Sequence, residues 1–328
     1  MRKINKTGFW FIFSLMLICL FWTGGSYGQD YPKSPIQIVL PFAPGGATDV
    51  LWRSISEYLA RNINGSITFV NKTGGGGVVG TSFVANSKPD GYTLVSANSD
   101  SLNIAPVFTP DVPYNPEKDF AYLAKLVLFP GTIATRVDAP YKTLEELIAF
   151  AKANPRKIKA GVAGMGTKPH MNVELFNREA GIEITPIPFG GGGEAVTNLL
   201  GGHVDVGILS VPSVKSHVLS GKVRVLAVFS PSRCADFPQV PTMAEKGYTS
   251  SNNTTGVGLA GPKGMAPVIV KKWEDAVDKT IKDPRVVAVI DKIGGLIVDY
   301  KTGEEYKKEL LADLRVFKEI IPTLPGRK

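Results

Sequence analysis

Residues 35–49 read PIQIVLPFAPGGATD, a short apolar run that ends in a glycine turn and leads into a helical pattern. Residues 36–40 have the length and β-branched content of a buried strand, and the prolines and glycines that follow stop it. Thr48 and Asp49 suit the first turn of a helix. Glycine lets backbone N–H groups approach a ligand, and a helix N-terminus carries about half a positive charge. This stretch predicts an α/β fold with an anion site at the turn, although many such turns bind nothing.

Strand-like runs alternate with helical patterns along the rest of the chain. The expected strands are 67–70, 93–97, 159–162, 184–188, 204–209, 223–229 and 256–260, and the expected helices include 144–153, 171–180, 194–200, 268–282 and 303–320. This alternation is typical of parallel sheets covered on both faces, which bind ligands beyond the carboxyl ends of their strands. A Gly- and Pro-rich loop near 130–141 and a polar loop near 247–255 predict two domains whose chain crosses twice between them.

Residues 1–28 have the pattern of a secretory signal peptide. A basic start precedes an apolar run at 9–22, and small residues near Gly28 provide a cleavage site before Gln29. The apolar run is shorter than the ~20 residues that a spanning helix needs. We therefore expect export to the periplasm with cleavage after Gly28, and a lipoprotein anchored at Cys19 is the minor alternative.

The chain is mildly basic once the leader is removed. Three of the 37 basic residues and none of the 29 acidic ones lie in the leader, which leaves 34 − 29 = +5. The basic residues are dispersed, without an aromatic-interleaved stripe, so we expect an anionic ligand and no nucleic acid. Only Cys234 survives processing, which excludes an internal disulfide.

A second loop repeats the geometry of the first. Residues 163–170, AGMGTKPH, follow a strand and open a helix. Thr167 offers a hydroxyl, Lys168 a cation, and His170 a donor or a packing group. Two facing anion sites would suit a dicarboxylate, whereas a solvated Lys168 is the ordinary alternative.

Two further glycine clusters carry weaker signals. Gly75, Gly77 and Gly80 match G-x-G-x-x-G, but four residues separate the first of them from the preceding strand, so the pattern does not favour NAD. Residues 190–193 are all glycine and predict a third flexible edge of the same crevice.

The sequence lacks the motifs of common enzymes. Its three histidines, at 170, 203 and 217, form no H-E-x-x-H motif, and the chain has no G-x-S-x-G and no paired cysteine ligands. We therefore expect neither catalytic residues nor a metal or other cofactor.

Several motifs occur in one order along the mature chain. They include YPKSPIQIVLPFAPGGATDVLWR at 31–53, VNKTGGGGVVGT at 70–81, PDGYTLVSANS at 89–99, ANPRKIKAGVAGMGTKPH at 153–170, LLGGHVDVGI at 199–208 and FPQVPTMAEKGY at 237–248. In these motifs the chain resembles the periplasmic solute-binding receptors of tripartite tricarboxylate transporters, the Bug- or TctC-type proteins.

The resemblance implies a two-lobed periplasmic binding protein, a type II-like Venus flytrap in which each lobe is a mainly parallel sheet flanked by helices. Lobe 1 would comprise residues 29–130 and 255–328, lobe 2 residues 131–254, and the ligand cleft would lie between them. The implied function is a monomeric receptor, without enzymatic activity, that closes on a di- or tricarboxylate and delivers it to membrane permease subunits. A secreted enzyme acting on an anionic substrate and a ligand-presenting sensor subunit are the alternatives.

The resemblance also implies ligand-binding residues. These are Ala43, Pro44, Gly45, Gly46, Ala47 and Thr48 in the first loop, Asn98 and Ser99 after the next strand, and Gly166, Thr167, His170 and Ser210 in lobe 2, with Ser213 at the border. The loop analysis adds Lys168, Gly190 and Gly191. Two departures from the family pattern, Phe189 before the glycines and Lys168-Pro169 before His170, prevent the ligand's identity from being transferred.

Overall fold

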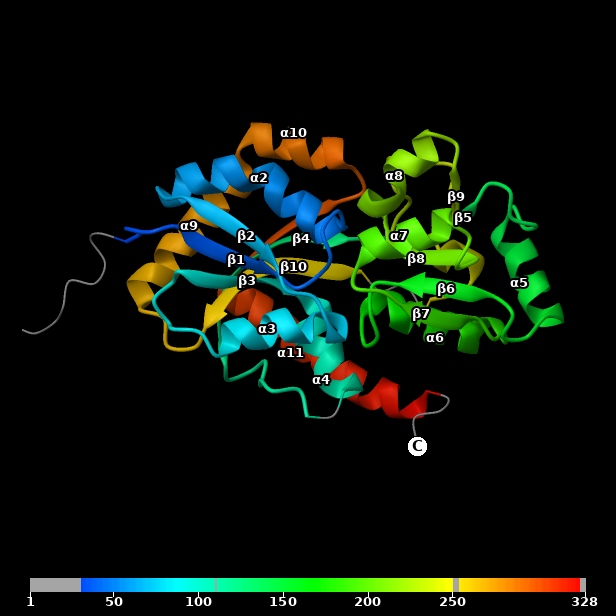
Figure 1. Ribbon diagram of the computed structural model, residues 1–328, viewed down its shortest axis with the longest axis horizontal. Helices are drawn as coiled ribbons and strands as arrows, with labels where there is room; N and C mark the ends of the chain where they lie inside the picture. The colour runs from blue at the N-terminus through cyan, green and yellow to red at the C-terminus, as the bar shows by residue number, and fades with distance from the viewer. Residues whose placement is uncertain (1–30, 110, 250–253, 325–328) are drawn as a thin grey trace, which may run out of the picture.

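The computed structural model describes residues 31–109, 111–249 and 254–324. The predicted signal peptide, its cleavage site and Cys19 lie outside these residues. The described chain forms two α/β lobes that lie side by side, each built on its own sheet (Figure 1).

Lobe 1 contains a six-stranded sheet in the order β11-β4-β10-β3-β1-β2. Its strands are β1 (Ile36–Leu40), β2 (Ile67–Asn71), β3 (Thr93–Asn98), β4 (Phe120–Phe129), β10 (Thr255–Pro262) and β11 (Ile297–Thr302). Strand β1 pairs in parallel with β2 and β3, whereas β10 is antiparallel to β3 and β4, and β11 is antiparallel to β4. The sheet is therefore mixed, with four strands running one way.

Helices cover both faces of this sheet. Helices α2 (Ala47–Ile63), α9 (Pro267–Lys282) and α10 (Pro284–Ile293) pack on one face, and α3 (Val78–Ala85) and α11 (Gly303–Ile320) pack on the other. Helix α2 buries one stripe completely, with Leu51, Ile55 and Leu59 at helical spacing. This packing fixes the N-terminus of α2 at the carboxyl end of β1.

Lobe 2 contains a five-stranded sheet in the order β7-β6-β8-β5-β9. Its strands are β5 (Gly131–Arg136), β6 (Lys159–Val162), β7 (Thr185–Pro188), β8 (Val206–Ser210) and β9 (Val223–Phe229). Helices α5 (Leu144–Ala153) and α6 (Lys168–Ala180) cover one face, and α7 (Gly192–Leu200) and α8 (Val211–Leu219) cover the other. Only β5 runs against the other four strands.

The prediction of a loop at 130–141 is wrong for residues 131–136, which form a strand. The chain leaves the first sheet at Phe129 and enters the second at Gly131, where residues 131–136 form β5 between β8 and β9. The turn residues Pro130 and Gly131 occupy only the crossing itself. The run TIAT that follows is fully buried, as a central strand requires.

The two lobes contact each other through backbone and through apolar side chains. Ala43 N–H donates to Gly190 O across the lobes at 3.0 Å. An apolar cluster joins α6 of lobe 2 to the short helix α4 (Ala105–Phe108) and the end of α11 in lobe 1. Its buried members are Ile104, Phe108, Met171, Leu175, Phe317, Ile321 and Leu324. The lobes therefore enclose the space between the carboxyl ends of their strands.

Candidate ligand site

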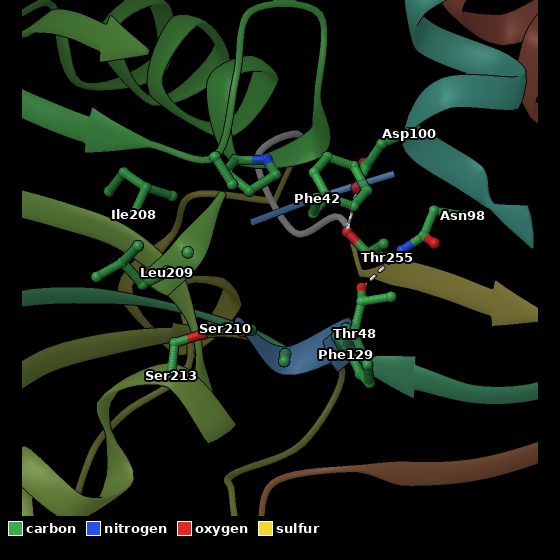
Figure 2. Close-up of a pocket in the computed structure, with 14 residues that line it drawn as sticks. Phe42, Thr48, Asn98, Asp100, Phe129, Ile208, Leu209, Ser210, Ser213 and Thr255 are labelled. Carbon is green, nitrogen blue, oxygen red and sulfur yellow. Dashed lines mark hydrogen bonds between the residues drawn. The ribbon is translucent and has the colours of Figure 1, made fainter. Parts of the chain in front are cut away.

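A cavity lies between the lobes where the strand ends of both sheets converge. It has about 60 Å³ of space open to water-sized molecules. Figure 2 shows Thr48, Asn98, Asp100 and Thr255 of lobe 1 grouped on one side, with Ser210 and Ser213 of lobe 2 on the other. The full lining is Phe42, Ala47, Thr48, Asn98, Asp100, Phe129, Ala163, Pro169, Gly192, Ile208, Leu209, Ser210, Ser213 and Thr255.

The first glycine loop holds the start of α2 at this cavity. Gly45 has a φ of +75°, which favours glycine, and its N–H donates to Asp49 Oδ2 at 3.2 Å. Asp49 Oδ1 accepts from Arg53 Nε at 2.9 Å and from Asn71 Nδ2 at 3.2 Å. The acid in the first turn therefore points back into the loop and is paired with Arg53. This leaves the positive end of α2, at Ala47 and Thr48, directed at the cavity.

A chain of buried hydrogen bonds orients the Thr48 hydroxyl. Trp52 Nε1 donates to Ser96 Oγ at 2.7 Å, Ser96 Oγ donates to Asn98 Oδ1 at 2.8 Å, and Asn98 Nδ2 donates to Thr48 Oγ at 3.0 Å. Since Thr48 Oγ accepts here, its hydrogen is left to donate into the cavity. The arrangement preorganises a donor for an anion.

Lobe 2 adds two helix N-termini. Gly192 begins α7 and Ser210 precedes α8, with the Ser210 and Ser213 hydroxyls 3.0 Å apart. A Cβ on Gly192 would lie 2.8 Å from Ser213 Oγ, so a side chain there would crowd the hydroxyl. The α7 backbone can therefore approach a ligand closely.

The predicted second anion site, at the start of α6, is filled by the protein itself. Lys168 N–H donates to Asp100 Oδ1 at 2.7 Å, and the Thr255 hydroxyl lies 3.2 Å from Asp100 Oδ2. Burial raises the pKa of the Asp100 carboxyl above its ordinary value, while the hydrogen bond and charge of Lys168 and the Thr255 hydroxyl oppose that rise. A carboxylate of lobe 1 therefore takes the place that the motif alone left open for a ligand.

Lys168 and His170 do not line the cavity. The Lys168 side chain is buried, with Nζ 3.4 Å from Asp313 Oδ2 in lobe 1, so the solvated alternative is wrong, and the ligand contact stays a prediction. His170 Nδ1 accepts from Gly166 N–H at 3.3 Å, and its ring packs edge-on against Phe108. Thr167 Oγ donates to Gly164 O at 2.8 Å. These groups hold the loop and the lobe interface, and Pro169 and Ala163 reach the cavity instead.

The other predicted positions divide in two groups. Ala47, Thr48, Asn98 and Ser210 line the cavity. Ala43, Pro44, Gly45 and Gly46 face Gly190, Gly191 and Gly193 across the lobes beside it, and Ser99 Oγ accepts from Gly256 N–H at 3.0 Å. The cavity thus has the predicted turn on one wall, with backbone contacts between the lobes next to it.

Among the described residues that line the cavity, the sequence reasoning missed most of the apolar side chains and the acidic Asp100. The missed apolar residues lie at or near strand ends, and in α/β folds this position alone would have predicted that they face the cavity. They are Phe42, Phe129, Ile208 and Leu209. Asp100 directly follows the predicted Asn98-Ser99 pair. Its carboxyl group accepts a hydrogen bond from the Lys168 N–H of lobe 2, and this distant partner could not be recognised from the sequence.

In the described part of the chain, no group of three or more His, Cys, Asp or Glu residues could hold a metal ion. Within the same residues, no helix has the length and apolar content needed to cross a membrane.

Comparison with known proteins agrees with this architecture. Residues 51–323 match the model of a protein family described as the tripartite tricarboxylate transporter family receptor. BugT of Bordetella pertussis is 35% identical over 260 residues, which cover 79% of this chain and 80% of BugT. Solved periplasmic binding proteins share the two-lobed fold.

Two related structures contain dicarboxylates. Rpa4515 of R. palustris, solved with adipate, is 25% identical with a TM-score of 0.85, covering 90% of this chain and 98% of its own. MatC of Rhodopseudomonas palustris, solved with bound malate, is 26% identical with a TM-score of 0.83, covering 89% of this chain and 100% of its own. The resemblance inferred from the motifs is confirmed: the chain belongs to the tripartite tricarboxylate transporter family of receptors, which are periplasmic solute-binding proteins.

Proposed function

We propose that this protein is a periplasmic receptor that captures a small organic carboxylate between its lobes by hinge closure and delivers it to the membrane permease of a tripartite tricarboxylate transporter. The observation that carries the proposal is the convergence of helix N-termini from both lobes on one cavity. Anions are stabilised at such termini by unpaired N–H groups and by the helix dipole. The adipate and malate found in two relatives support a carboxylate ligand.

The ligand would be held mainly by backbone amides and hydroxyls. Ala47, Thr48 and Gly192 would meet one carboxylate, with Ser210 and Ser213 beside it. We propose the division into lobe 1 (29–130 with 255–328) and lobe 2 (131–254) as part of the hinge mechanism. In the open form, the two lobes would separate and carry the two walls of the cavity apart. Closure would then trap the ligand in a partly desolvated space.

Ligand screening on purified protein tests the proposal. Small molecules released from the protein by denaturation are identified by mass spectrometry, and mono-, di- and tricarboxylates are compared with neutral sugars by thermal shift. Carboxylate at about 100 times its dissociation constant should stabilise the fold by about 2.7 kcal/mol. Stabilisation by sugars and by no carboxylate would contradict the proposal.

Closure and the absence of chemistry are tested separately. Small-angle scattering should show a smaller radius of gyration when ligand is added. Ligand recovered unchanged after long incubation would count against the alternative of a secreted enzyme.

Signal-peptide cleavage is tested on the exported protein. N-terminal analysis should give Gln29 as the first residue, and a lipid on Cys19 would refute the proposed cleavage after Gly28.

A further inference from the structure

Helix α8 of lobe 2 contacts lobe 1 on the side that faces away from the ligand cavity. Ser210 and Ser213, at the start of α8, line the cavity. Val211 and Lys215 are outside its described lining. At about 100° per residue, Val211 lies about 200° around the helix from Ser213, and Lys215 follows Val211 one turn later on the same face. The helix therefore stands between the cavity and the groups that Val211 and Lys215 contact.

These two side chains meet the loop between α10 and β11 of lobe 1. Gly294 and Gly295 in this loop have φ values of +83° and +63°, which favour glycine. A Cβ on Gly295 would lie under 3.0 Å from Val211, and a Cβ on Gly294 would lie under 3.0 Å from Lys215 and Asp236. All of these atoms belong to lobe 2. The two glycines therefore let the lobes approach each other closely, and we call this the hinge-side contact.

The Lys215 ammonium joins the two lobes at the hinge-side contact. Its Nζ lies 2.7 Å from Asp236 Oδ1 in lobe 2 and donates to Lys292 O in lobe 1 at 3.2 Å. Lys292 is in the last turn of α10, where backbone carbonyls lack a partner within the helix and a cation is favourable. The side chains of Lys215 and Asp236 are 21% and 19% exposed, so salt screens this interaction only weakly. Figure 1 shows the end of α10 beside α8.

The hinge-side contact lies near a crossing between the lobes. Strand β11 begins at Ile297, which pairs with Leu128 of β4, the strand that leads to the crossing at Pro130. Pro130 and Gly295 border one groove of about 380 Å³. In the proposed hinge closure, displacement grows with distance from the axis, so residues beside a crossing move least. The hinge-side contact is therefore placed to hold α8 in a fixed position relative to lobe 1.

We propose that the hinge-side contact positions α8 for ligand binding. Val211 and Lys215 are then positioning residues, which act on the ligand only by holding the two serine hydroxyls of α8 in the cavity. The inference rests on the proposed function, since it needs a carboxylate bound between the lobes. It adds a determinant of affinity that lies outside the cavity.

Gly295→Ala tests the hinge-side contact from lobe 1. The new Cβ would displace Val211 and with it the start of α8, so the affinity for a carboxylate should fall about fivefold or more. Gly181→Ala is the matched control. Gly181 has a φ of +61°, close to the +63° of Gly295, and a Cβ there would meet no described atom within 4 Å. The control thus carries the same backbone strain, and its affinity should stay within about twofold of wild type.

Lys215→Met tests the contact from lobe 2. Methionine keeps an aliphatic side chain and removes the cation that reaches Lys292 O, so affinity should again fall about fivefold. Lys246→Met is the control, because Lys246 forms its ion pair with Glu145 at 2.6 Å inside lobe 2. Its affinity should stay within about twofold of wild type. Hydrogen exchange without ligand should rise in α8 and in the loop after α10 together for Lys215→Met, and in neither for the control.

Succinate, glutarate and citrate are the probes in calorimetry, and the one that wild type binds most tightly is used for all variants. Wild-type affinity in Gly295→Ala overturns the role of Val211, and wild-type affinity in Lys215→Met overturns that of Lys215. Equal losses in Lys215→Met and Lys246→Met also overturn the inference. Each of these results leaves the carboxylate receptor standing. Circular dichroism checks folding, and if Gly295→Ala does not fold, the two lysine variants decide alone. If wild type binds no probe, the proposed function falls, and the inference falls with it.

Discussion

Gly193 lies in the first turn of α7, where lobe 2 meets the glycine loop of lobe 1. A Cβ at this position would lie 2.5 Å from Pro44 O, and real Cβ atoms essentially never approach closer than 3.0 Å. Gly193→Ala would therefore force the two backbones apart by roughly 0.5–0.9 Å, the difference from contacts of 3.0–3.4 Å. The three atoms that this Cβ would meet, Pro44 O, Gly45 C and Gly46 N, all belong to the backbone, so the loops themselves must move.

The same substitution should not harm lobe 2 alone. Gly193 has no positive φ and lies within α7, where alanine is compatible with the backbone. Replacing glycine at such a position stabilises a fold by about 0.4–1 kcal/mol. In the proposed hinge mechanism the clash arises only in the closed arrangement, where overpacking costs about 1–3 kcal/mol. We therefore expect ligand binding to weaken by about 5- to 150-fold, while the ligand-free protein melts at the same or a higher temperature.

Calorimetry measures the affinity, and thermal unfolding without ligand measures the stability. Gly46→Ala is the matched control, because its Cβ would meet the same lobe interface at ordinary distances of 3.4–3.6 Å. A change within ±0.5 kcal/mol, or about twofold in affinity, is expected for this control. Wild-type affinity in Gly193→Ala would refute the reasoning, since binding would then not require the lobes to meet at this contact.

Three further changes test particular side chains. Lys168→Met should lower the free energy of unfolding by only about 1 kcal/mol, because its partner Asp313 is 39% exposed and solvent weakens the ion pair. The same change should alter ligand affinity by less than about threefold, and a larger loss of affinity would indicate that Lys168 contacts the ligand. Because burial raises the pKa of Asp100, its protonated form favours folding; that contribution is complete below the unfolded value of 3.8 and is lost as pH rises through the folded pKa. Asp100→Asn should therefore raise stability at pH 7 relative to wild type, with the gain shrinking toward pH 4 in urea titrations. Lys125→Met should cost about 3 kcal/mol in urea unfolding, because Lys125 is 1% exposed and pairs with Asp299 and Glu309.

Lys125 also explains why the sequence did not predict strands β4 and β11. The strands that were predicted are short apolar runs, which can be recognised from neighbouring residues alone. Strand β4 carries Lys125 at its centre, and that lysine is buried only because Asp299 and Glu309, 174 and 184 residues away, lie beside it. Strand β11, which supplies Asp299, is partly exposed and lacks an apolar run. A buried charge and its distant partners can be recognised only when the topology is known.

The first loop was predictable for the opposite reason. Its strand, its turn and its helix are contiguous, and Asp49 is neutralised within the same segment by Arg53. The direction of α2 toward the ligand side follows from the carboxyl end of β1, which is a property of the fold class. Residues 35–49 alone therefore predict an anion site at the start of this helix, and the family resemblance adds Ala47 and Thr48, which line the cavity.

The loop at 163–170 has the same local features, and its helix N-terminus does bind a carboxyl group. That group is the side chain of Asp100, which lies 68 residues earlier in the chain and on the other lobe. A strand-turn-helix motif predicts that unpaired backbone N–H groups will be present at the start of the helix. Which acceptor binds them depends on the residues that the rest of the fold places nearby. Because the acceptor belongs to the protein, this helix N-terminus is satisfied without a ligand carboxylate. The helix N-termini that line the cavity are those of α2, α7 and α8, and the ligand carboxylate is proposed to bind there.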